Sequence, residues 1–311
     1  MKAVVIEQYG DKHQLKEKEL DQPVPDENQV VVELHATSIN PIDWKLREGY
    51  LKEMLDFDFP IILGWDAAGV IKEVGTAVEK FKVGDRVFAR PETTRFGTYA
   101  EYTTVDEHLL AYLPENVSFE EAAAVPLAGL TAWQCLVDFA EIQEGDRVLV
   151  HAGSGGVGHY AIQIAKQKGA YVATTASGKN KEWVENLGVD RFINYKEEDF
   201  TEVLSDYDIV LDTLGGEIQE KSFKVLKEGG RLPSIVQPPE ESLTEKYGVK
   251  ADFIWLEPSG GKLSKLATMM QEGDLVSVVG HRFDLTEEGL KEAHALSESH
   301  HAKGKIIIKI K

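Results

Sequence analysis

The second half of the chain alternates short apolar runs with segments whose apolar positions recur at helical spacing. The apolar runs predict strands at Arg147–His151, Tyr171–Thr175, Arg191–Asn194, Ile209–Asp212 and Gly230–Val236. The intervening segments predict helices at Gly156–Lys168, Lys179–Leu187 and Gln219–Leu226, with one more between the third and fourth strands. Strict alternation predicts a parallel sheet covered by helices on both faces, because right-handed crossover connections place the helices there.

The first part of the chain alternates β-rich runs with Gly, Pro and Asp turns. The expected strands are Ala3–Ile6, Val30–Ala36, Gly69–Val74, Arg86–Ala89 and Thr98–Val105. A helix is predicted to begin at Ser118, with acidic residues in its first turn, and a second helix to cover Ala128–Leu136. This part is therefore expected to form a compact β domain.

The end of the chain carries weaker patterns. Phe253–Leu256 is consistent with a strand and Leu263–Gln271 with a helix. Gly304–Ile310 alternates like an edge strand that carries lysines on its exposed face.

The turn between the first strand and the first helix of the second half is the most informative motif. It reads Gly-x-Gly-x-x-Gly and consists of Gly153, Ser154, Gly155, Gly156, Val157 and Gly158. Such a turn lets bare backbone approach a pyrophosphate, and the helix N-terminus supplies unpaired N–H donors. The strand before it and the helix after it favour dinucleotide binding over a purely structural glycine turn.

Composition limits the other possibilities. A chain of 311 residues, 42% of them hydrophobic, is long enough for two domains. The formal charge of −19 disfavours nucleic acid and anionic membrane surfaces as partners. The single cysteine, Cys135, excludes an intrachain disulfide and a cysteine-based zinc cluster. The apolar start is interrupted by Glu7 and no apolar run is long enough to span a bilayer, so we expect a cytoplasmic protein.

The segment after the second strand of the nucleotide half contains no acidic residue. NAD-selective folds usually place Asp or Glu about 20 residues after the glycine turn. Here Ser177, Lys179 and Lys181 occupy the region, and a hydroxyl with two ammonium groups suits a 2′-phosphate. The alternative is a solvated helix start, but cations there oppose the helix dipole. The predicted cofactor is therefore NADPH.

Five separated motifs support a resemblance to a known family. They are Ser38-Ile-Asn-Pro-Ile-Asp43, Gly64-Trp-Asp-Ala-Ala-Gly69, Val83-Gly-Asp-Arg-Val87, Gly129-Leu-Thr-Ala-Trp133 and the glycine turn. Over its whole length the chain resembles the medium-chain dehydrogenase/reductase superfamily, and within it the zinc-independent quinone oxidoreductase branch. The resemblance implies an α/β protein, with a chaperonin-10-like (GroES-like) β domain at 1–121 and 273–311. A doubly wound parallel-sheet (Rossmann) nucleotide-binding domain is implied at 122–272.

The resemblance also implies a homodimer and bears on metal binding. Phe253–Leu256 is the candidate pairing strand, although an ordinary buried strand is an equal alternative. The positions that match the zinc ligands of related alcohol dehydrogenases carry Asn40, Trp65 and Leu127. An amide is a poor zinc ligand, and indole and isobutyl groups offer no donor, so no metal site is expected. The neighbouring histidines at 300 and 301 are expected to be solvated.

Several site residues follow from the resemblance. Asn40 and Thr131 are expected to lie against the nicotinamide ring, where an amide and a hydroxyl can donate and accept hydrogen bonds. Tyr50 is expected to border the substrate pocket, and a packing role is an equal alternative. The resemblance implies that Asp43 supports the Asn40 loop, and the pattern Asn-Pro-x-Asp gives the alternative that Asp43 only caps the helix that follows.

The family further implies that Tyr195 holds the 2′-phosphate and that Ser234 lies in a loop that closes over the cofactor. Without a Lewis acid the acceptor must take a hydride unaided, which favours quinones and α,β-unsaturated carbonyls. The predicted function is a zinc-free, NADPH-dependent quinone reductase with a small-molecule substrate. The alternatives are a 2-alkenal or enone reductase, a zinc-type alcohol dehydrogenase, and a non-enzymatic NADPH-binding protein.

Overall fold

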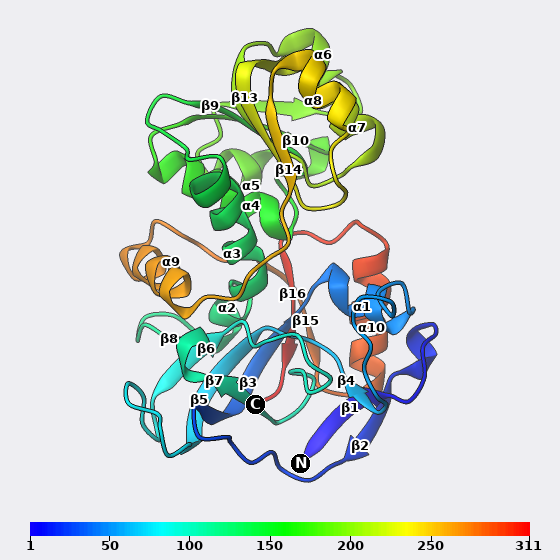
Figure 1. The fold of residues 1–311 in the computed structure, drawn as a ribbon, viewed down its shortest axis with the longest axis vertical. Coiled ribbons are helices and arrows are strands. Elements are labelled where there is room, and N and C mark those ends of the chain that lie inside the picture. The colour runs from blue at the N-terminus through cyan, green and yellow to red at the C-terminus, as the bar shows by residue number, and fades with distance from the viewer. The chain divides into compact units, whose positions relative to one another are not determined.

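The computed structural model describes residues 1–311, which form two compact units (Figure 1). The first unit contains residues 1–127 and 258–311, and the second contains residues 128–257. The helix α3 (Pro126–Trp133) includes the boundary between them. Both ends of the chain therefore belong to the first unit. None of the helices has the length and apolar character needed to span a membrane.

The first unit is rich in strands. One sheet has the order β2-β1-β4, and a second has the order β15-β16-β3-β5-β6-β8 with β7 paired to β3. The strands are β1 (Lys2–Ile6), β2 (Lys16–Glu19), β3 (Gln29–Ile39), β4 (Ile61–Ile62), β5 (Ala67–Val74), β6 (Arg86–Ala89), β7 (Tyr102–Asp106), β8 (Leu110–Tyr112), β15 (Val279–Asp284) and β16 (Lys305–Lys309). The helices are α1 (Pro41–Arg47), α2 (Phe119–Ala123), α9 (Gly260–Glu272) and α10 (Glu287–Glu298), with short 3₁₀ turns η1 (Lys12–Gln14) and η2 (Glu107–Leu109).

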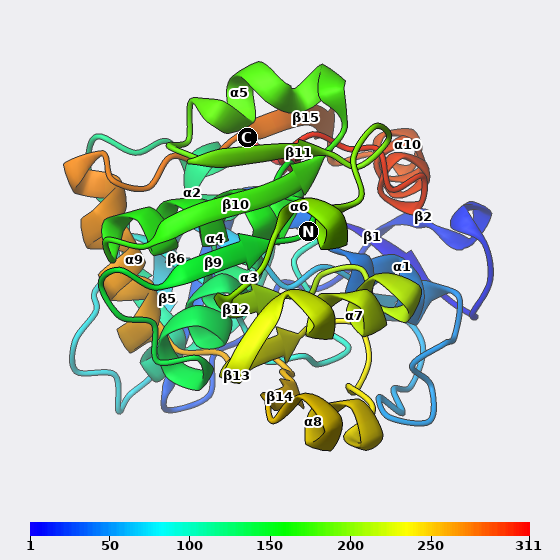
Figure 2. The same ribbon diagram turned by 90° about the horizontal axis from the view of Figure 1, so that it is seen from above.

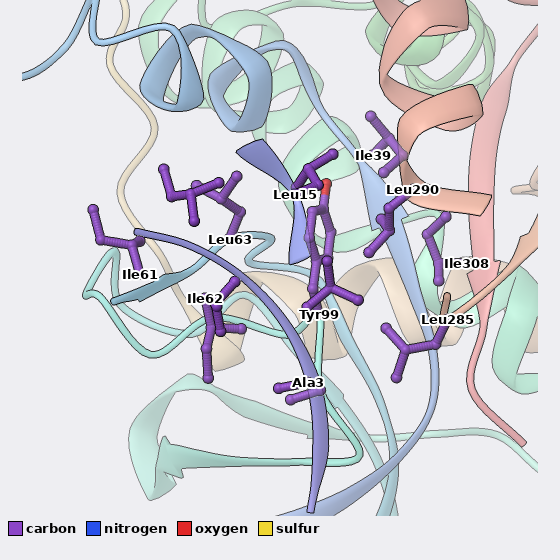
Figure 3. Packing of buried hydrophobic residues seen from close by; sticks show 14 of the residues in the cluster. Ala3, Leu15, Ile39, Ile61, Ile62, Leu63, Tyr99, Leu285, Leu290 and Ile308 are labelled. Carbon is purple, nitrogen blue, oxygen red and sulfur yellow. The ribbon is translucent and has the colours of Figure 1, made fainter. Parts of the chain in front are cut away.

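An apolar core joins the smaller sheet to α10 and β16 within this unit. Figure 3 shows side chains from β1, β4, α10 and β16 gathered around the ring of Tyr99. Ala3, Ile61, Leu290 and Ile308 in this core are completely buried. Burial of aliphatic side chains stabilises by about 1.5–3 kcal/mol each, so this core fixes α10 on the sheets. It also surrounds the polar tip of Tyr99, whose partners are described below.

The second unit is a six-stranded parallel sheet with helical connections (Figure 2). Its strands are β9 (Arg147–Val150), β10 (Tyr171–Ala176), β11 (Arg191–Asn194), β12 (Tyr207–Leu211), β13 (Leu226–Ser234) and β14 (Lys250–Phe253). Its helices are α4 (Gly156–Gln167), α5 (Lys181–Glu185), α6 (Phe200–Val203), α7 (Gly216–Ser222) and α8 (Glu241–Tyr247), with a π-helix η3 (Gln134–Phe139) and 3₁₀ turns η4 (Gly178–Asn180) and η5 (Phe223–Val225).

The strand order of this sheet is diagnostic. The order is β11-β10-β9-β12-β13-β14, so the first strand lies in the middle and the chain moves outward in both directions from it. This is the order of doubly wound dinucleotide-binding folds, in which ligands bind at the carboxyl ends of the strands where the order reverses. The predicted parallel sheet and fold class are confirmed.

The last strand differs from the prediction. β16 is not an edge strand, because it pairs in parallel with β15 and antiparallel with β3. The edge position belongs to β15, which the sequence pattern did not indicate. Lys305 at the start of β16 is only 3% exposed, whereas Lys309 at its end is exposed. The prediction that both lysines lie on an exposed face therefore holds for Lys309 and is wrong for Lys305.

The C-terminal limit of the second unit also differs from the expected 122–272. α9 belongs to the first unit, where it packs against η2 and β8. A Cβ on Gly260, its first residue, would lie 2.4 Å from the carbonyl oxygen of Leu110. β14 ends at Phe253, where the sequence prediction had placed the start of a strand, and it is an edge strand of the sheet.

Candidate active site

The glycine turn follows β9, the strand at which the order of the parallel sheet reverses. A Cβ on Gly153 would lie 2.1 Å from Oγ1 of Thr174, so the turn can pass β10 only without a side chain. A Cβ on Gly158 would lie 2.4 Å from the carbonyl oxygen of Ala152. The N-cap of α4, Gly155, provides no side-chain cap. The first backbone N–H groups of this helix therefore suit an anionic ligand.

The other residues of the turn complete this surface. Ser154, Gly156 and Val157 are all partly exposed, whereas the two glycines that pack on the protein are buried. No acidic residue lies in the first turn of α4. The turn thus provides open backbone with no competing negative charge, which is what a dinucleotide pyrophosphate requires.

We expect Gly158→Ala to lower the thermal unfolding midpoint by several degrees and to weaken NADPH binding at least tenfold. The added methyl group collides with backbone atoms, so the turn and the start of α4 must move apart. Differential scanning fluorimetry and a fluorescence titration with NADPH measure the two effects.

Gly261→Ala is the matched control. A Cβ there meets only Oγ of Ser259 at 3.9 Å, and alanine is the better helix former. Its midpoint should stay the same or rise. Equal behaviour of the two variants would show that the turn tolerates a side chain.

The ends of β10 and β11 lie side by side at the same edge of the sheet. Ala176 is the register partner of Asn194, so the residues that follow, Ser177 and Tyr195, are brought together. The backbone N–H of Tyr195 donates to the carbonyl oxygen of Ala176 at 3.3 Å. The Tyr195 side chain is 57% exposed and is thus accessible to a ligand.

The segment after β10 presents one nearly buried hydroxyl and two exposed lysines. Oγ of Ser177, a residue only 9% exposed, accepts a hydrogen bond from Nδ2 of Asn180 at 3.2 Å. Lys179 is exposed, and Nζ of Lys181 lies 3.8 Å from Oε1 of Glu185. Because an exposed pair at this distance contributes little, both ammonium groups can turn toward an anion.

Ser234 has a different environment from the one expected for a cofactor-covering loop. Its hydroxyl is fully buried and donates to Oδ2 of Asp212 at 2.8 Å. Nε2 of Gln219 donates to both of these side chains. The other oxygen of Asp212 accepts from the backbone N–H groups of Leu214 and Gly215. Ser234 therefore ties together the segments that follow β12 and β13.

A second polar group is buried in the first unit, around Asn40. Nδ2 of Asn40 donates to Oδ2 of Asp66 at 2.7 Å, and Oδ1 accepts from Nζ of Lys305 at 2.5 Å. The same Lys305 nitrogen lies 3.6 Å from Asp66. Asp66 also accepts from Oγ of Ser38 at 2.5 Å and from the backbone N–H of Leu127 at 2.8 Å. Burial lowers the pKa of Lys305, and the neighbouring carboxylates oppose that shift.

Asp43 contributes to the N-terminal cap of α1 as predicted, although the N-cap residue is Asn40 and Asp43 lies in the first turn. Its Oδ2 accepts from the backbone N–H of Asn40 at 2.8 Å and also from the hydroxyl of Tyr99 at 2.8 Å. Its Oδ1 is buried with no hydrogen-bond partner. Burial raises the pKa of Asp43 to about 7, although both hydrogen bonds act in the other direction.

The hydrogen bonds continue from Tyr99 to α10. Nε2 of His294 lies 3.0 Å from the Tyr99 hydroxyl, and Nη1 of Arg47 lies 2.9 Å from Nδ1 of His294. Since a guanidinium only donates, Nδ1 must accept, and Nε2 carries the hydrogen that is donated to Tyr99. Arg47 is completely buried and pairs with Glu48 and with Glu298. Burial, followed by the charge of Arg47, lowers the pKa of His294 to about 3.

The remaining predicted residues differ widely in exposure. Thr131 is 5% exposed and lies on α3, one helical turn after Leu127. Tyr50 is 71% exposed and packs edge to face on Trp44, with ring centroids 6.4 Å apart. Trp65 is buried, and its indole N–H donates to the carbonyl oxygen of Thr94 at 3.1 Å.

Sequence reasoning did not single out Lys305, Tyr99 or His294. The last two are single residues of common types, and nothing in the sequence connects them to Asp43. A signal for Lys305 was present, since it directly precedes three isoleucines in a strand. A charged residue in so apolar a strand indicates either a solvent-exposed end or a buried ionic partner.

Two protein-family models match parts of the chain. The family described as "Alcohol dehydrogenase GroES-like domain" matches residues 26–115, and the family described as "Zinc-binding dehydrogenase" matches residues 187–308. The chloroplastic NADPH-dependent alkenal/one oxidoreductase of Arabidopsis thaliana is 36% identical, over 99% of this chain and 79% of that protein. The chain belongs to the medium-chain dehydrogenase/reductase superfamily. The resemblance predicted from the sequence is thereby confirmed.

Solved structures of this superfamily superpose on the whole chain. The quinone oxidoreductase from Coxiella burnetii has a TM-score of 0.91 and 36% identity, over 100% of this chain and 99% of that one. The quinone oxidoreductase of Escherichia coli, solved in complex with NADPH, has a TM-score of 0.89 and 27% identity, over 99% of this chain and 100% of that one.

Proposed function

We propose that this member of the superfamily is an NADPH-dependent reductase that transfers a hydride to quinones or related conjugated carbonyls without zinc. One observation carries the proposal: the chain shares 36% identity over almost its full length with an NADPH-dependent alkenal/one oxidoreductase. The related quinone oxidoreductase of Escherichia coli was solved in complex with NADPH. The glycine turn and the residues after β10 and β11 have the chemistry that this cofactor needs.

The residues of the second unit fit NADPH. The open backbone between Gly153 and Gly158 and the uncapped start of α4 suit the pyrophosphate. Ser177, Lys179 and Tyr195 offer donors for a 2′-phosphate, and residues 176–181 contain no carboxylate. Bound NADPH supplies the hydride.

We further propose that Asn40 stabilises the reacting oxygen of the acceptor. An Nδ2–H donor can bind an oxygen that gains negative charge when the conjugated system accepts a hydride. The hydride brings two electrons and one proton, and a second proton, taken from water or a hydroxyl group, completes the reduced product. Thr131 then orients the nicotinamide side of the site, and exposed Tyr50 contributes to acceptor binding.

Zinc independence is proposed on the donor set. Oδ1 of Asn40 already accepts a hydrogen bond from the Lys305 ammonium at 2.5 Å, so a metal ion bound to this oxygen would be repelled by that positive charge. Trp65 and Leu127 provide no metal-binding atom. We expect the purified protein to contain less than stoichiometric zinc and to keep its turnover after chelation. Loss of turnover that added zinc restores would overturn this part of the proposal.

Turnover with a panel of acceptors tests the function. Wild-type protein is mixed with NADPH or NADH and with 1,4-benzoquinone, naphthoquinones, 2-alkenals or a saturated ketone, and the loss of reduced-cofactor absorbance is followed. We expect reduction of conjugated acceptors with NADPH and little reduction of the saturated ketone. Faster turnover of 2-alkenals than of quinones would favour the enone reductase, an activity that appears in the relative's name. Tight NADPH binding with no acceptor reduced would favour a non-enzymatic role.

Lys179→Ala is expected to reduce kcat/KM for NADPH roughly tenfold while changing that for NADH less than twofold, since a bond to a charged phosphate contributes about 1.5 kcal/mol. Lys224→Ala is the control, because Lys224 is exposed just before β13, which lies on the other side of β9 from β10. An equal loss with both cofactors would refute a phosphate contact by Lys179.

We also propose a cytoplasmic homodimer with no nucleic-acid partner. β14 pairs only with β13, and Trp255 beyond its end is 46% exposed. An unpaired strand edge of this kind suits pairing with the same edge of a second copy across a two-fold axis. Sedimentation equilibrium should give twice the mass of the chain, and a monomer at micromolar concentration would refute the dimer.

The other two parts of this proposal rest on composition. The single cysteine fits a reducing compartment such as the cytoplasm, and the charge of −19 opposes binding to nucleic acid.

A further inference from the structure

The most unusual charged group in the first unit is Lys305. It is 3% exposed, and its strand continues with three isoleucines that are 4% exposed or less. Its Nζ donates to Oδ1 of Asn40 at 2.5 Å and to the carbonyl oxygen of Ile39 at 3.2 Å, and lies 3.6 Å from Asp66. Burial of an ammonium costs several kcal/mol, and these partners offset that cost, so Lys305, Asn40 and Asp66 depend on one another.

The chemistry of its neighbours fixes the orientation of the Asn40 amide. An ammonium has no acceptor, so the atom that faces Lys305 must be the amide oxygen. An ionised carboxylate has no donor, so the atom that faces Asp66 must be the amide nitrogen. The amide is therefore held at both ends, by a cation at Oδ1 and an anion at Nδ2.

Asp66, the anion at Nδ2, is itself held in place by other hydrogen bonds. Besides Asn40, Asp66 accepts from the Ser38 hydroxyl and the Leu127 N–H, and it is completely buried. Nδ2 carries two hydrogens, and only one of them is used in the bond to Asp66. The second hydrogen has a fixed direction and no acceptor in the protein.

We propose that Lys305 is a positioning residue, which together with Asp66 orients and polarises the Asn40 amide so that its second Nδ2 hydrogen is presented to the oxygen of the acceptor. The inference rests on the proposed function and extends it to a residue on the last strand. A cation at Oδ1 withdraws electron density from the amide, so the remaining N–H becomes a stronger donor. Asp66 thus orients the amide, and the Lys305 ammonium supplies electrophilic assistance to the acceptor oxygen through it.

The test compares Lys305→Met with Lys305→Arg. Methionine retains the length of the side chain and removes the charge, whereas arginine retains a donor for Oδ1. We expect Lys305→Met to lower kcat for the best quinone by roughly 10- to 100-fold with the Kd of NADPH changed less than twofold. In Lys305→Arg, the decrease in log kcat should be at most half of the decrease in Lys305→Met. Lys309→Met, an exposed lysine of the same strand, should behave like wild type.

Two further measurements keep the test decisive. If Lys305→Met does not fold, Lys305→Met/Asp66→Asn removes both charges, and we expect it to fold with the same loss of kcat. Side-chain amide NMR of asparagine-labelled protein reports on Asn40 without turnover. In Lys305→Met its two Nδ2 hydrogen resonances should shift, whereas Lys309→Met should leave them in place.

Specific results would overturn the inference. An unchanged kcat in Lys305→Met would show that the charge has no role in the reaction, and unchanged Asn40 resonances would show that it does not hold the amide. A matching rise in the Kd of NADPH would make Lys305 a cofactor contact instead. Wild-type protein that reduces no acceptor would refute the proposed function, and the NMR comparison would still decide whether Lys305 positions Asn40.

Discussion

Replacing Asp66 by alanine is expected to lower the free energy of unfolding by about 3–5 kcal/mol, the usual cost of removing one partner of a buried charge pair. Asp66 accepts hydrogen bonds from Ser38, Asn40 and Leu127 and faces the ammonium of Lys305. Without the carboxylate these donors stay buried with no acceptor, and the lysine loses the carboxylate that lies 3.6 Å away. Urea unfolding followed by circular dichroism measures the loss.

Asp58→Ala is the control for that experiment. Asp58 is exposed, so its removal should change stability by less than about 0.5 kcal/mol. A loss below about 1 kcal/mol for Asp66→Ala would show that the buried network contributes less than its geometry indicates. Adding Lys305→Met should recover part of the loss, because the uncompensated charge is then removed.

Much of the second unit follows from its sequence because its signals are local. A buried parallel strand is a short apolar run, and the glycine turn lies between such a run and a helix, so β9, the turn and α4 can be assigned from about 20 neighbouring residues. The end of β10 and the lack of an acidic residue after it can likewise be recognised from a few neighbouring residues. The same reasoning misplaced β14 by three residues, because Lys250 and Asp252 make the strand look polar.

In the first unit, the predicted runs overlap β1, β3, β5, β6 and β7, and the prediction failed at β15, whose contacts are distant in sequence. β15 was not predicted, since Val279–Asp284 contains Gly280, His281 and Arg282 and lacks an apolar alternation. Its place is set by pairing with β16, which in turn pairs with β3 from the start of the chain. A pattern within either segment cannot report such a partner.

The buried polar residues show the same limit. Asn40 was predicted from the motif around it, yet its two partners lie 26 and 265 residues away. Lys305 was read as a surface lysine, because lysine on an alternating strand is usually exposed. The family resemblance predicts a role for Asn40, and the structure shows that Asp66 and Lys305 hold its amide.

His294 should make the first unit sensitive to acid. Its pKa is lowered to about 3 in the folded protein, against about 6.5 in an unfolded chain. Between about pH 6.5 and 3, His294 is therefore protonated in the unfolded state and neutral in the folded state. The free energy of unfolding decreases as the pH falls through this interval. Over the whole interval this linkage amounts to about 5 kcal/mol. Asp43, with its pKa raised to about 7, acts in the opposite sense, because its stabilising contribution is lost as the pH rises from about 4 to 7.

Comparing His294→Gln with wild type isolates the histidine, because Asp43 remains in both proteins. A glutamine amide can accept from Arg47 and donate to Tyr99, as the neutral imidazole does, but it does not titrate. At pH 7.5 the variant should be less stable by about 1 kcal/mol through imperfect packing. Near pH 4.5 the order should reverse, since wild type has then lost about 2–3 kcal/mol. Urea unfolding across this pH range measures the difference, and His13→Gln, at an exposed histidine, should follow wild type throughout. A difference independent of pH would mean that His294 takes up its proton in the folded protein as readily as in the unfolded chain.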